Sequence, residues 1–295
     1  MHQSSLYGTG VALITPFNSD GSIDYASLEA LINHVIHGGV NYVVTLGTTG
    51  ETSTLTTTEK LQVANATLKI VNQRVPVVIG IGGSSTAQVI EALSVLPTTQ
   101  AEAILSVVPY YNKPSQQGIY AHYNAIAAST TKPIILYNVP GRTGRNMEAA
   151  TTLALAHAHN HIVAIKEASG DMAQCMQLIA NAPPHFMVLS GDDNLALAQI
   201  ACGMKGVISV AANYYASEYS AMIQHSLRYE CAQAQAILYK LLPALDYMFA
   251  ENNPAGIKAY LAYSHITQQH TRLPVVPVSA ALQQQIEAYL TLNTN

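Results

Sequence analysis

Ile162-Val163-Ala164-Ile165-Lys166 is the stretch that decides the fold, because four consecutive apolar residues end in a lysine. An apolar run of this length without alternation is typical of a strand that is buried on both faces, as in a parallel sheet. Seven other runs are of the same kind, at 10–14, 42–46, 75–81, 103–108, 133–139, 186–189 and 207–210. The sequence therefore predicts eight parallel strands.

Helical patterns separate these runs, among them those at 25–37, 58–72, 86–96, 117–129, 147–157 and 171–181. Ser22, the segment 56–59 and Asp171 precede three of the helices and are typical of helix starts. Eight strand–helix repeats predict an α/β fold of the closed (β/α)8 type, a TIM barrel. An open doubly wound sheet is the alternative. Such a sheet usually has a G-x-G-x-x-G motif after its first strand, whereas here Gly80-Ile81-Gly82 follows the third run and Ser85 replaces the third glycine.

The last part of the chain has a different pattern. After residue 228 no strand-like run follows, and segments rich in Ala, Leu and Tyr continue to residue 295. Pro243, the segment 252–254, Pro274 and Pro277 predict breaks between helices there. We expect a barrel over residues 1–227 and a C-terminal helical domain over residues 228–295.

The composition excludes several classes of protein. The 13 lysines and arginines are scattered through 295 residues with a formal charge of -4, which argues against nucleic acid as a partner. No run reaches the roughly 18 apolar residues of a membrane span, and the N-terminus shows no targeting signal. Three cysteines without C-x-x-C spacing favour a reducing cytoplasm. Because only 10% of residues are charged, we expect a homo-oligomer.

Lys166 is the predicted nucleophile. Active sites of such barrels lie at the carboxyl ends of the strands, and Lys166 alone among the eight lysines ends a buried-type strand. Burial disfavours a charged ammonium and so favours an amine that attacks a carbonyl carbon. The alternative is a structural lysine paired with the neighbouring carboxylate of Glu167.

Other strand ends carry groups that suit carbonyl chemistry. Tyr137 offers a phenol that could move a proton beside the amine, or it is an ordinary buried tyrosine. Thr48 and Thr49, between two glycines, offer hydroxyls and N–H groups for a carboxylate or oxyanion, or form a plain polar turn. Arg142 could bind a second carboxylate through two hydrogen bonds, or remain a solvated loop arginine.

A histidine cluster, His157, His159 and His161, resembles a metal site only at first sight. It precedes the 162–165 strand and so belongs to the opposite face of the barrel, where we expect a solvated helix end. The sequence therefore predicts no metal site.

Taken together, the motifs identify the chain as similar to the dihydrodipicolinate synthase family of the pyruvate-dependent class I aldolase superfamily. The likeness extends from residue 8 to residue 258 and rests on four segments found in order. They are Gly47-Thr-Thr-Gly-Glu51, Pro109-Tyr-Tyr-Asn112, Tyr137-Asn-Val-Pro140 and Ile165-Lys-Glu167. Each segment alone is weak, but the set is specific.

The resemblance implies that pyruvate condenses with L-aspartate 4-semialdehyde, a step of diaminopimelate and lysine biosynthesis. It implies a tetramer built as a dimer of dimers, with neither a metal nor an organic cofactor. It also implies roles for eight residues: an imine on Lys166, a proton relay of Tyr137, Thr48 and a neighbouring subunit's Tyr111, carboxylate binding by Thr49 and Arg142, and a pocket lining at Gly191 and Ile208.

Relatives of the superfamily form the alternatives. N-acetylneuraminate lyase and 2-keto-3-deoxygluconate aldolase share the lysine and the tyrosine, and a non-catalytic keto-acid-binding protein would be of another class. Arg142 and the paired Tyr110-Tyr111 resemble the synthase, whereas Gly141 stands where that family commonly has serine. An intact Lys166 and Tyr137 argue against the binding protein.

The resemblance also bears on feedback inhibition by lysine. In lysine-inhibited members of the family, a glutamate, an asparagine and two histidines surround the inhibitor, together with a tyrosine. Here Gln88 and Ser84 stand at the first two positions, Thr57 and Lys60 at the histidine positions, and Tyr110 is kept. The site has lost its carboxylate, so we expect weak or absent inhibition.

Overall fold

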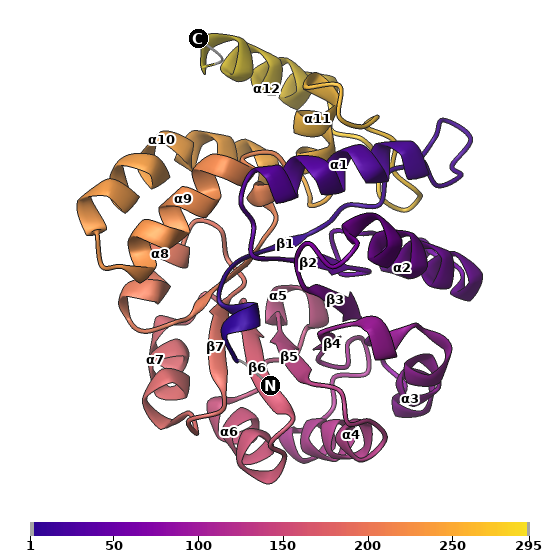
Figure 1. The fold of residues 1–295 in the computed structure, drawn as a ribbon, viewed down its shortest axis with the longest axis vertical. Coiled ribbons are helices and arrows are strands. Elements are labelled where there is room, and N and C mark those ends of the chain that lie inside the picture. The colour runs from indigo at the N-terminus through magenta and orange to yellow at the C-terminus, as the bar shows by residue number, and fades with distance from the viewer. Residues whose placement is uncertain (1–2, 294–295) are drawn as a thin grey trace.

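The computed structural model describes residues 3–293 and contains a closed barrel of eight parallel strands (Figure 1). The strands follow one another around the barrel in chain order, and β1 pairs with both β2 and β8. They are β1 Gly8–Ala12, β2 Tyr42–Thr45, β3 Val77–Gly80, β4 Ala103–Val107, β5 Ile134–Asn138, β6 Ile162–Glu167, β7 Met187–Ser190 and β8 Gly206–Ser209. The predicted barrel is confirmed, and the open sheet is wrong.

Helices surround the barrel and continue beyond it (Figure 1). Those of the barrel are α1 Tyr25–His37, α2 Thr57–Val71, α3 Thr86–Val95, α4 Gln116–Ala128, α5 Pro140–Thr143, α6 Ala149–Ala158, α7 Met172–Asn181, α8 Ala196–Ala201 and α9 Ala216–Leu227. After them come α10 Cys231–Phe249, α11 Ala255–Tyr263 and α12 Ala280–Asn293. Short 3-10 turns are η1 Gln3–Leu6, η2 Thr52–Thr54, η3 Thr98–Gln100 and η4 Ala211–Asn213.

The apolar residues form two cores, one inside the barrel and one between the strands and the helices. Alternate strand residues such as Ile135, Ala164 and Leu189 fill the inside, whereas Val188 and Ile165 face the helices. This alternation has a period of two residues. Lys166 follows Ala164 by two positions, so it too belongs to the inner face.

The helix starts were predicted with one error. Thr56 and Glu59 form a reciprocal capping box at α2, and the Asp171 carboxylate accepts hydrogen bonds from two N–H groups at the start of α7. Ser22 does not cap α1, because the residue directly before the helix is Asp24, whose carboxylate accepts from the Ser27 N–H. The Ser22 hydroxyl donates to Asp20 instead.

The helix breaks were also predicted with one error. Helix α10 continues through Pro243, because the neighbouring Leu241, Ala244 and Leu245 are buried and their packing holds the helix despite the missing N–H. The break at 252–254 is confirmed, since α10 ends at Phe249 and α11 begins at Ala255. The region of Pro274 and Pro277 lies between α11 and α12, as predicted.

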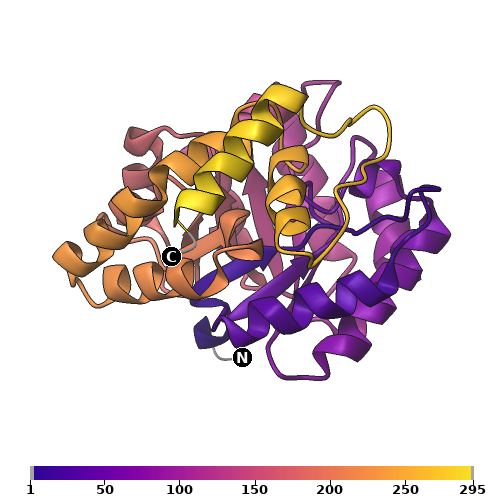
Figure 2. The same cartoon turned by 90° about the horizontal axis from the view of Figure 1, so that it is seen from above.

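The segment between α11 and α12 turns back to the first half of the chain. Figure 2 shows this segment in yellow reaching over to the purple helices near the N-terminal end of the sequence. Arg272 makes the contact, donating hydrogen bonds to Glu59 of α2. Within residues 3–293, no helix combines the length and the hydropathy of a membrane span.

Candidate active site

Lys166 lies at the end of β6 beside Tyr137 of β5. The two residues are partners in the β5–β6 register, so their side chains point to the same inner face. The Nζ atom of Lys166 is 4.4 Å from the centre of the Tyr137 ring. Only 6% of Lys166 and 7% of Tyr137 are exposed. An amine and a phenol are thus held together in a nearly dry site.

Glu167 points away from Lys166, to the outer side of the barrel wall. Its carboxylate accepts hydrogen bonds from the Asn138 and Gln174 side chains and from the Ser169 N–H. Among the residues described by the structure, Lys166 forms no ion pair. The alternative in which Glu167 neutralises Lys166 is therefore wrong.

Gly191, which follows β7, leaves the space that the Lys166 side chain occupies. A Cβ atom on Gly191 would lie 2.5 Å from Ala168 Cβ, too close for that neighbour, and 3.0 Å from Lys166 Cε, which would have to shift. Ile208 of β8 is fully buried on the inner face of the barrel. Gly191 is thus next to the amine, whereas Ile208 belongs to the interior packing.

Thr48 and Thr49 lie in a tight loop after β2. The loop is closed by hydrogen bonds from the Gly50 N–H to the Gly47 carbonyl and from the Glu51 N–H to the Thr48 carbonyl. The Thr49 hydroxyl oxygen accepts a hydrogen bond of 3.1 Å from the Asn253 side chain, although 204 residues separate the two. Thr49 is buried and Thr48 is partly exposed, so they face different surroundings.

Arg142 lies on the short helix α5, which begins at Pro140 just after β5. Its side chain is exposed. One long hydrogen bond of 3.4 Å runs from its guanidinium to the Asn253 carbonyl. Most donors of this guanidinium are therefore available to an anion from outside.

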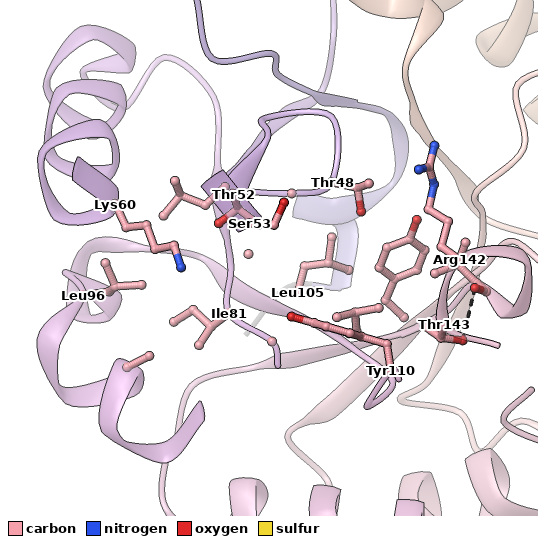
Figure 3. A pocket seen from close by; sticks show the side chains of 18 residues that line it. Thr48, Thr52, Ser53, Lys60, Ile81, Leu96, Leu105, Tyr110, Arg142 and Thr143 are labelled. Carbon is pink, nitrogen blue, oxygen red and sulfur yellow. Dashed lines mark hydrogen bonds between the residues drawn. The ribbon is translucent and has the colours of Figure 1, made fainter. Parts of the chain in front are cut away.

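Thr48, Tyr137 and Arg142 line a cavity of about 330 Å³, whereas Lys166 and Thr49 are not among its lining residues (Figure 3). Figure 3 shows Thr48 and Arg142 near one end, Tyr110 below them, and Lys60 beside Leu96 at the other end. Tyr137 also lines the cavity, and its ring connects the cavity to Lys166. The structure thus brings together the amine, the phenol, a hydroxyl and a guanidinium.

Tyr111 does not join this group within one chain. It is 91% exposed, and its backbone has a φ of 69°, a left-handed conformation that is rare for a bulky residue. Hydrogen bonds from Asn112 to Tyr110 and Ser84 carbonyls hold the adjacent loop in place. A fixed and exposed tyrosine of this kind suits contact with another molecule.

Sequence reasoning assigned no role to Asn253 and Asp192. Asn253 contacts both Thr49 and Arg142, and its Oδ1 atom is buried without a hydrogen-bond partner. Burial raises the pKa of Asp192 to about 6, and the charge of Lys166 opposes this rise. Asp192 could have been noticed because it closely follows the strand at 186–189.

The histidines near the start of β6 lie away from these groups. The ring of His159 bonds to the Asn124 side chain, and the ring of His161 bonds to the Ala127 carbonyl. Over residues 3–293 the structure contains no cluster of three His, Cys, Asp or Glu side chains that could hold a metal ion.

Known proteins are similar to this chain over nearly its whole length. The model of the dihydrodipicolinate synthetase family matches residues 5–293. A curated relative from Azobacteroides pseudotrichonymphae, named 4-hydroxy-tetrahydrodipicolinate synthase, is 45% identical over 99% of both chains. The structure of the Acinetobacter baumannii dihydrodipicolinate synthase complexed with pyruvate is 37% identical, with a TM-score of 0.94 over 97% of this chain and 98% of that one.

A further solved structure, described as a monomeric dihydrodipicolinate synthase variant, is 34% identical. Its TM-score is 0.95, over 98% of this chain and 97% of that one. The family match, the sequence identity and the barrel geometry agree. The chain belongs to the dihydrodipicolinate synthetase family, a family of lyases.

Proposed function

We propose that this chain joins pyruvate to L-aspartate 4-semialdehyde through an imine on Lys166. The proposal rests on the surroundings of this amine, which is buried and in no described ion pair. Lys166 is 6% exposed, lies against the ring of Tyr137 and forms no ion pair with any residue that the structure describes. A buried amine that no described carboxylate holds in an ion pair is suited to attack on a carbonyl carbon.

The first half-reaction forms the imine. Lys166 Nζ adds to the keto carbon of pyruvate, and the resulting carbinolamine loses water as the C–N double bond forms. The leaving hydroxyl needs a proton, and the phenol of Tyr137 lies beside Lys166 on the same face of the barrel. Thr49 and the N–H groups of its loop hold the pyruvate carboxylate.

The second half-reaction forms the carbon–carbon bond. The Tyr137 phenolate left by the first half-reaction takes a proton from the methyl carbon of the imine, and the resulting enamine attacks the aldehyde carbon. Tyr137, Thr48 and Tyr111 of a neighbouring subunit return protons to the developing alkoxide. Arg142 binds the carboxylate of the semialdehyde, because its guanidinium lines the cavity and has free donors.

The test of this function is chemical trapping. Incubation with pyruvate and borohydride should reduce the imine to a stable amine, which peptide mass mapping should locate on Lys166. Labelling of Lys60, Lys132 or Lys205 instead would contradict the proposal. Turnover with each candidate aldehyde then tells the synthase from N-acetylneuraminate lyase and 2-keto-3-deoxygluconate aldolase, and from a binding protein without turnover.

We also propose that the active site is completed by a second copy, in a tetramer built as a dimer of dimers. Tyr111 is 91% exposed in one chain and therefore needs another surface to become part of a dry site. Mixing a Tyr111→Phe variant with a Lys166→Ala variant tests this, because hybrid dimers regain one intact site. No recovery on mixing would contradict the shared site, and light scattering gives the number of subunits.

The cytoplasm is the compartment that we propose for the protein. Cys175, Cys202 and Cys231 are free, and the last two are exposed. Exposed free thiols persist in a reducing compartment. Labelling of cells with a fluorescent fusion checks this location.

A further inference from the structure

A buried ion pair joins the Thr48–Thr49 loop to helix α11. The carboxylate of Glu51, two residues after Thr49, lies 2.5 Å from Lys258 Nζ. The exposed fractions of the two side chains are 1% and 0%. The two residues are 207 positions apart in the sequence. The contact therefore connects the loop of the active site to the far end of the chain.

Further contacts fix both partners of this pair. Lys258 Nζ also donates to the His270 carbonyl at 2.7 Å and lies 4.3 Å from the centre of the Phe17 ring. The second oxygen of Glu51 accepts from the Arg272 N–H at 3.0 Å. Burial lowers the pKa of Lys258 to about 8, and Glu51 opposes this by favouring the ammonium. Because both buried charges have several hydrogen-bond partners at fixed positions, these contacts favour a single arrangement of the two side chains.

The loop itself has a conformation that it would not hold alone. Leu46 has a φ of 58° and Glu51 a φ of 51°, so two non-glycine residues at its ends are in the left-handed region. Such conformations cost free energy and persist where surrounding contacts impose them. At one end the ion pair supplies this contact, and in the middle the Asn253 side chain bonds to Thr49.

We propose that Lys258 and Glu51 are positioning residues, which hold the Thr48–Thr49 loop in the geometry that pyruvate needs. Neither side chain touches a substrate, and both act through the loop. The inference rests on the proposed roles of Thr48 and Thr49. It predicts that loss of the pair damages the pyruvate half-reaction more than the binding of the semialdehyde, which depends on Arg142.

Three variants test this: Lys258→Met, Glu51→Gln, and the double variant with both changes. In the single variants a buried polar or charged group loses its partner, so we expect lower thermal stability and a roughly 10- to 100-fold loss of kcat/KM for pyruvate. The KM for the semialdehyde should change less than about threefold. The double variant leaves neither charge unpaired, so its Tm should recover while kcat/KM for pyruvate stays low.

Glu59→Gln is the matched control. It removes another ion pair between the same C-terminal segment and the barrel, that of Glu59 with the Arg272 guanidinium, and leaves the backbone N–H of Arg272 to bond to Glu51. We expect a lower Tm and unchanged kinetics. If the single variants do not fold, the double variant and Glu51→Asp, which keeps the charge but shortens the side chain, supply the kinetic comparison.

Three outcomes would overturn the positioning role: recovery of activity together with Tm in the double variant, equal kinetic damage in Glu59→Gln, or an equal rise of both KM values. Borohydride trapping of pyruvate on Lys166 in the unaltered enzyme separates this inference from the function on which it rests. Trapping with normal kinetics in Lys258→Met rejects the positioning role alone. No trapping in the unaltered enzyme rejects the proposed function itself.

Discussion

Two regions of the molecule contain the same types of side chain in different states. At the strand ends, Lys166 Nζ lies 4.4 Å from the Tyr137 ring, with Arg142 on the neighbouring helix. Where α11 meets the barrel, Lys258 Nζ lies 4.3 Å from the centre of the Phe17 ring, and Arg272 Cζ lies 4.5 Å from the same ring centre. Both lysines are buried. Burial and a neighbouring ring thus do not tell a reactive lysine from a structural one.

The partners of the charges tell the two regions apart. Lys258 has the carboxylate of Glu51, and Arg272 has that of Glu59 and the Gly21 carbonyl. Within the part of the chain that the structure describes, Lys166 has no ion pair and Arg142 has one long hydrogen bond. The region of Lys258 and Arg272, whose charges are paired, connects distant parts of the chain. The region of Lys166 and Arg142 has hydrogen-bond donors available and can bind substrates.

Lys166→Ala should have the largest effect. The variant removes the nucleophile and breaks no ion pair among the described residues, so turnover should fall at least about 10,000-fold while the protein stays folded. Activity assays and circular dichroism measure the two results. A collapse of the fold would show that Lys166 is structural, as Lys258 is, and would remove the contrast between the two lysines.

Arg142→Ala should have the next largest effect. Hydrogen bonds to charged groups contribute about 1.5–3 kcal/mol, so the KM for the semialdehyde should rise roughly 10- to 100-fold. Imine formation with pyruvate should stay nearly normal, because Arg142 meets the second substrate. Steady-state kinetics with both substrates check this, and equal damage to both would count against the assigned role.

In the region where the C-terminal segment meets the barrel, Glu59 should make the free energy of unfolding depend on pH. Hydrogen bonds from Arg272 hold the pKa of Glu59 at about 2, below its ordinary value of 4.5, against the opposing effect of burial. The folded form therefore stays ionised while the unfolded form takes up protons, so the contribution is present above pH 4.5 and disappears towards pH 2. Allowing for solvent screening, we expect about 1–2 kcal/mol.

Urea unfolding of the original chain and of Glu59→Gln measures this contribution. At pH 7 the original chain should be more stable than the variant, and the gap should shrink as the pH falls below 4.5. A gap that stays constant with pH would mean that the Glu59 charge does not stabilise the folded form.

L-lysine should have the smallest effect, which is none at submillimolar concentration. Lys60 and Arg142 are the charged residues among those that line the cavity, and both are cationic. Thr57 and Gln88 are exposed and neutral, and the Ser84 hydroxyl already donates to the Tyr110 carbonyl. A lysine ammonium would find no carboxylate there, and losing one charge-assisted contact weakens binding roughly 10- to 100-fold. Clear submillimolar inhibition in a steady-state assay would contradict this reading.

The fold was predictable because its signals are local. Each strand shows itself as a short apolar run, and the capping residues of α2 and α7 stand beside the helices that they start. The ends of the strands were less accurate: β1 covers Gly8–Ala12, whereas the pattern predicted 10–14. Gly8 and Thr9 are buried in the barrel by pairing with β8, which a local pattern does not show.

The site was predictable in part, for the same reason. Lys166 and Tyr137 each end a strand, so their position in the sequence indicated their place in the barrel. Glu51, Lys258 and Asn253 depend on contacts between residues more than 200 positions apart, and their partners could not be read from the chain. Lys258 did leave a signal, because it is the one charged residue within helix α11.

The long separation between Glu51 and Lys258 has a consequence for the order in which the protein is made. After Glu51 has been synthesised, another 207 residues must be added before Lys258 is present. At a synthesis rate of roughly 5–20 residues per second, this delay is about 10–40 seconds. During that time the remaining strands are synthesised, up to β8, which closes the barrel before Glu51 has its partner. We therefore expect the loop that holds Thr48 and Thr49 to become ordered among the last parts of the active site when the chain folds on the ribosome.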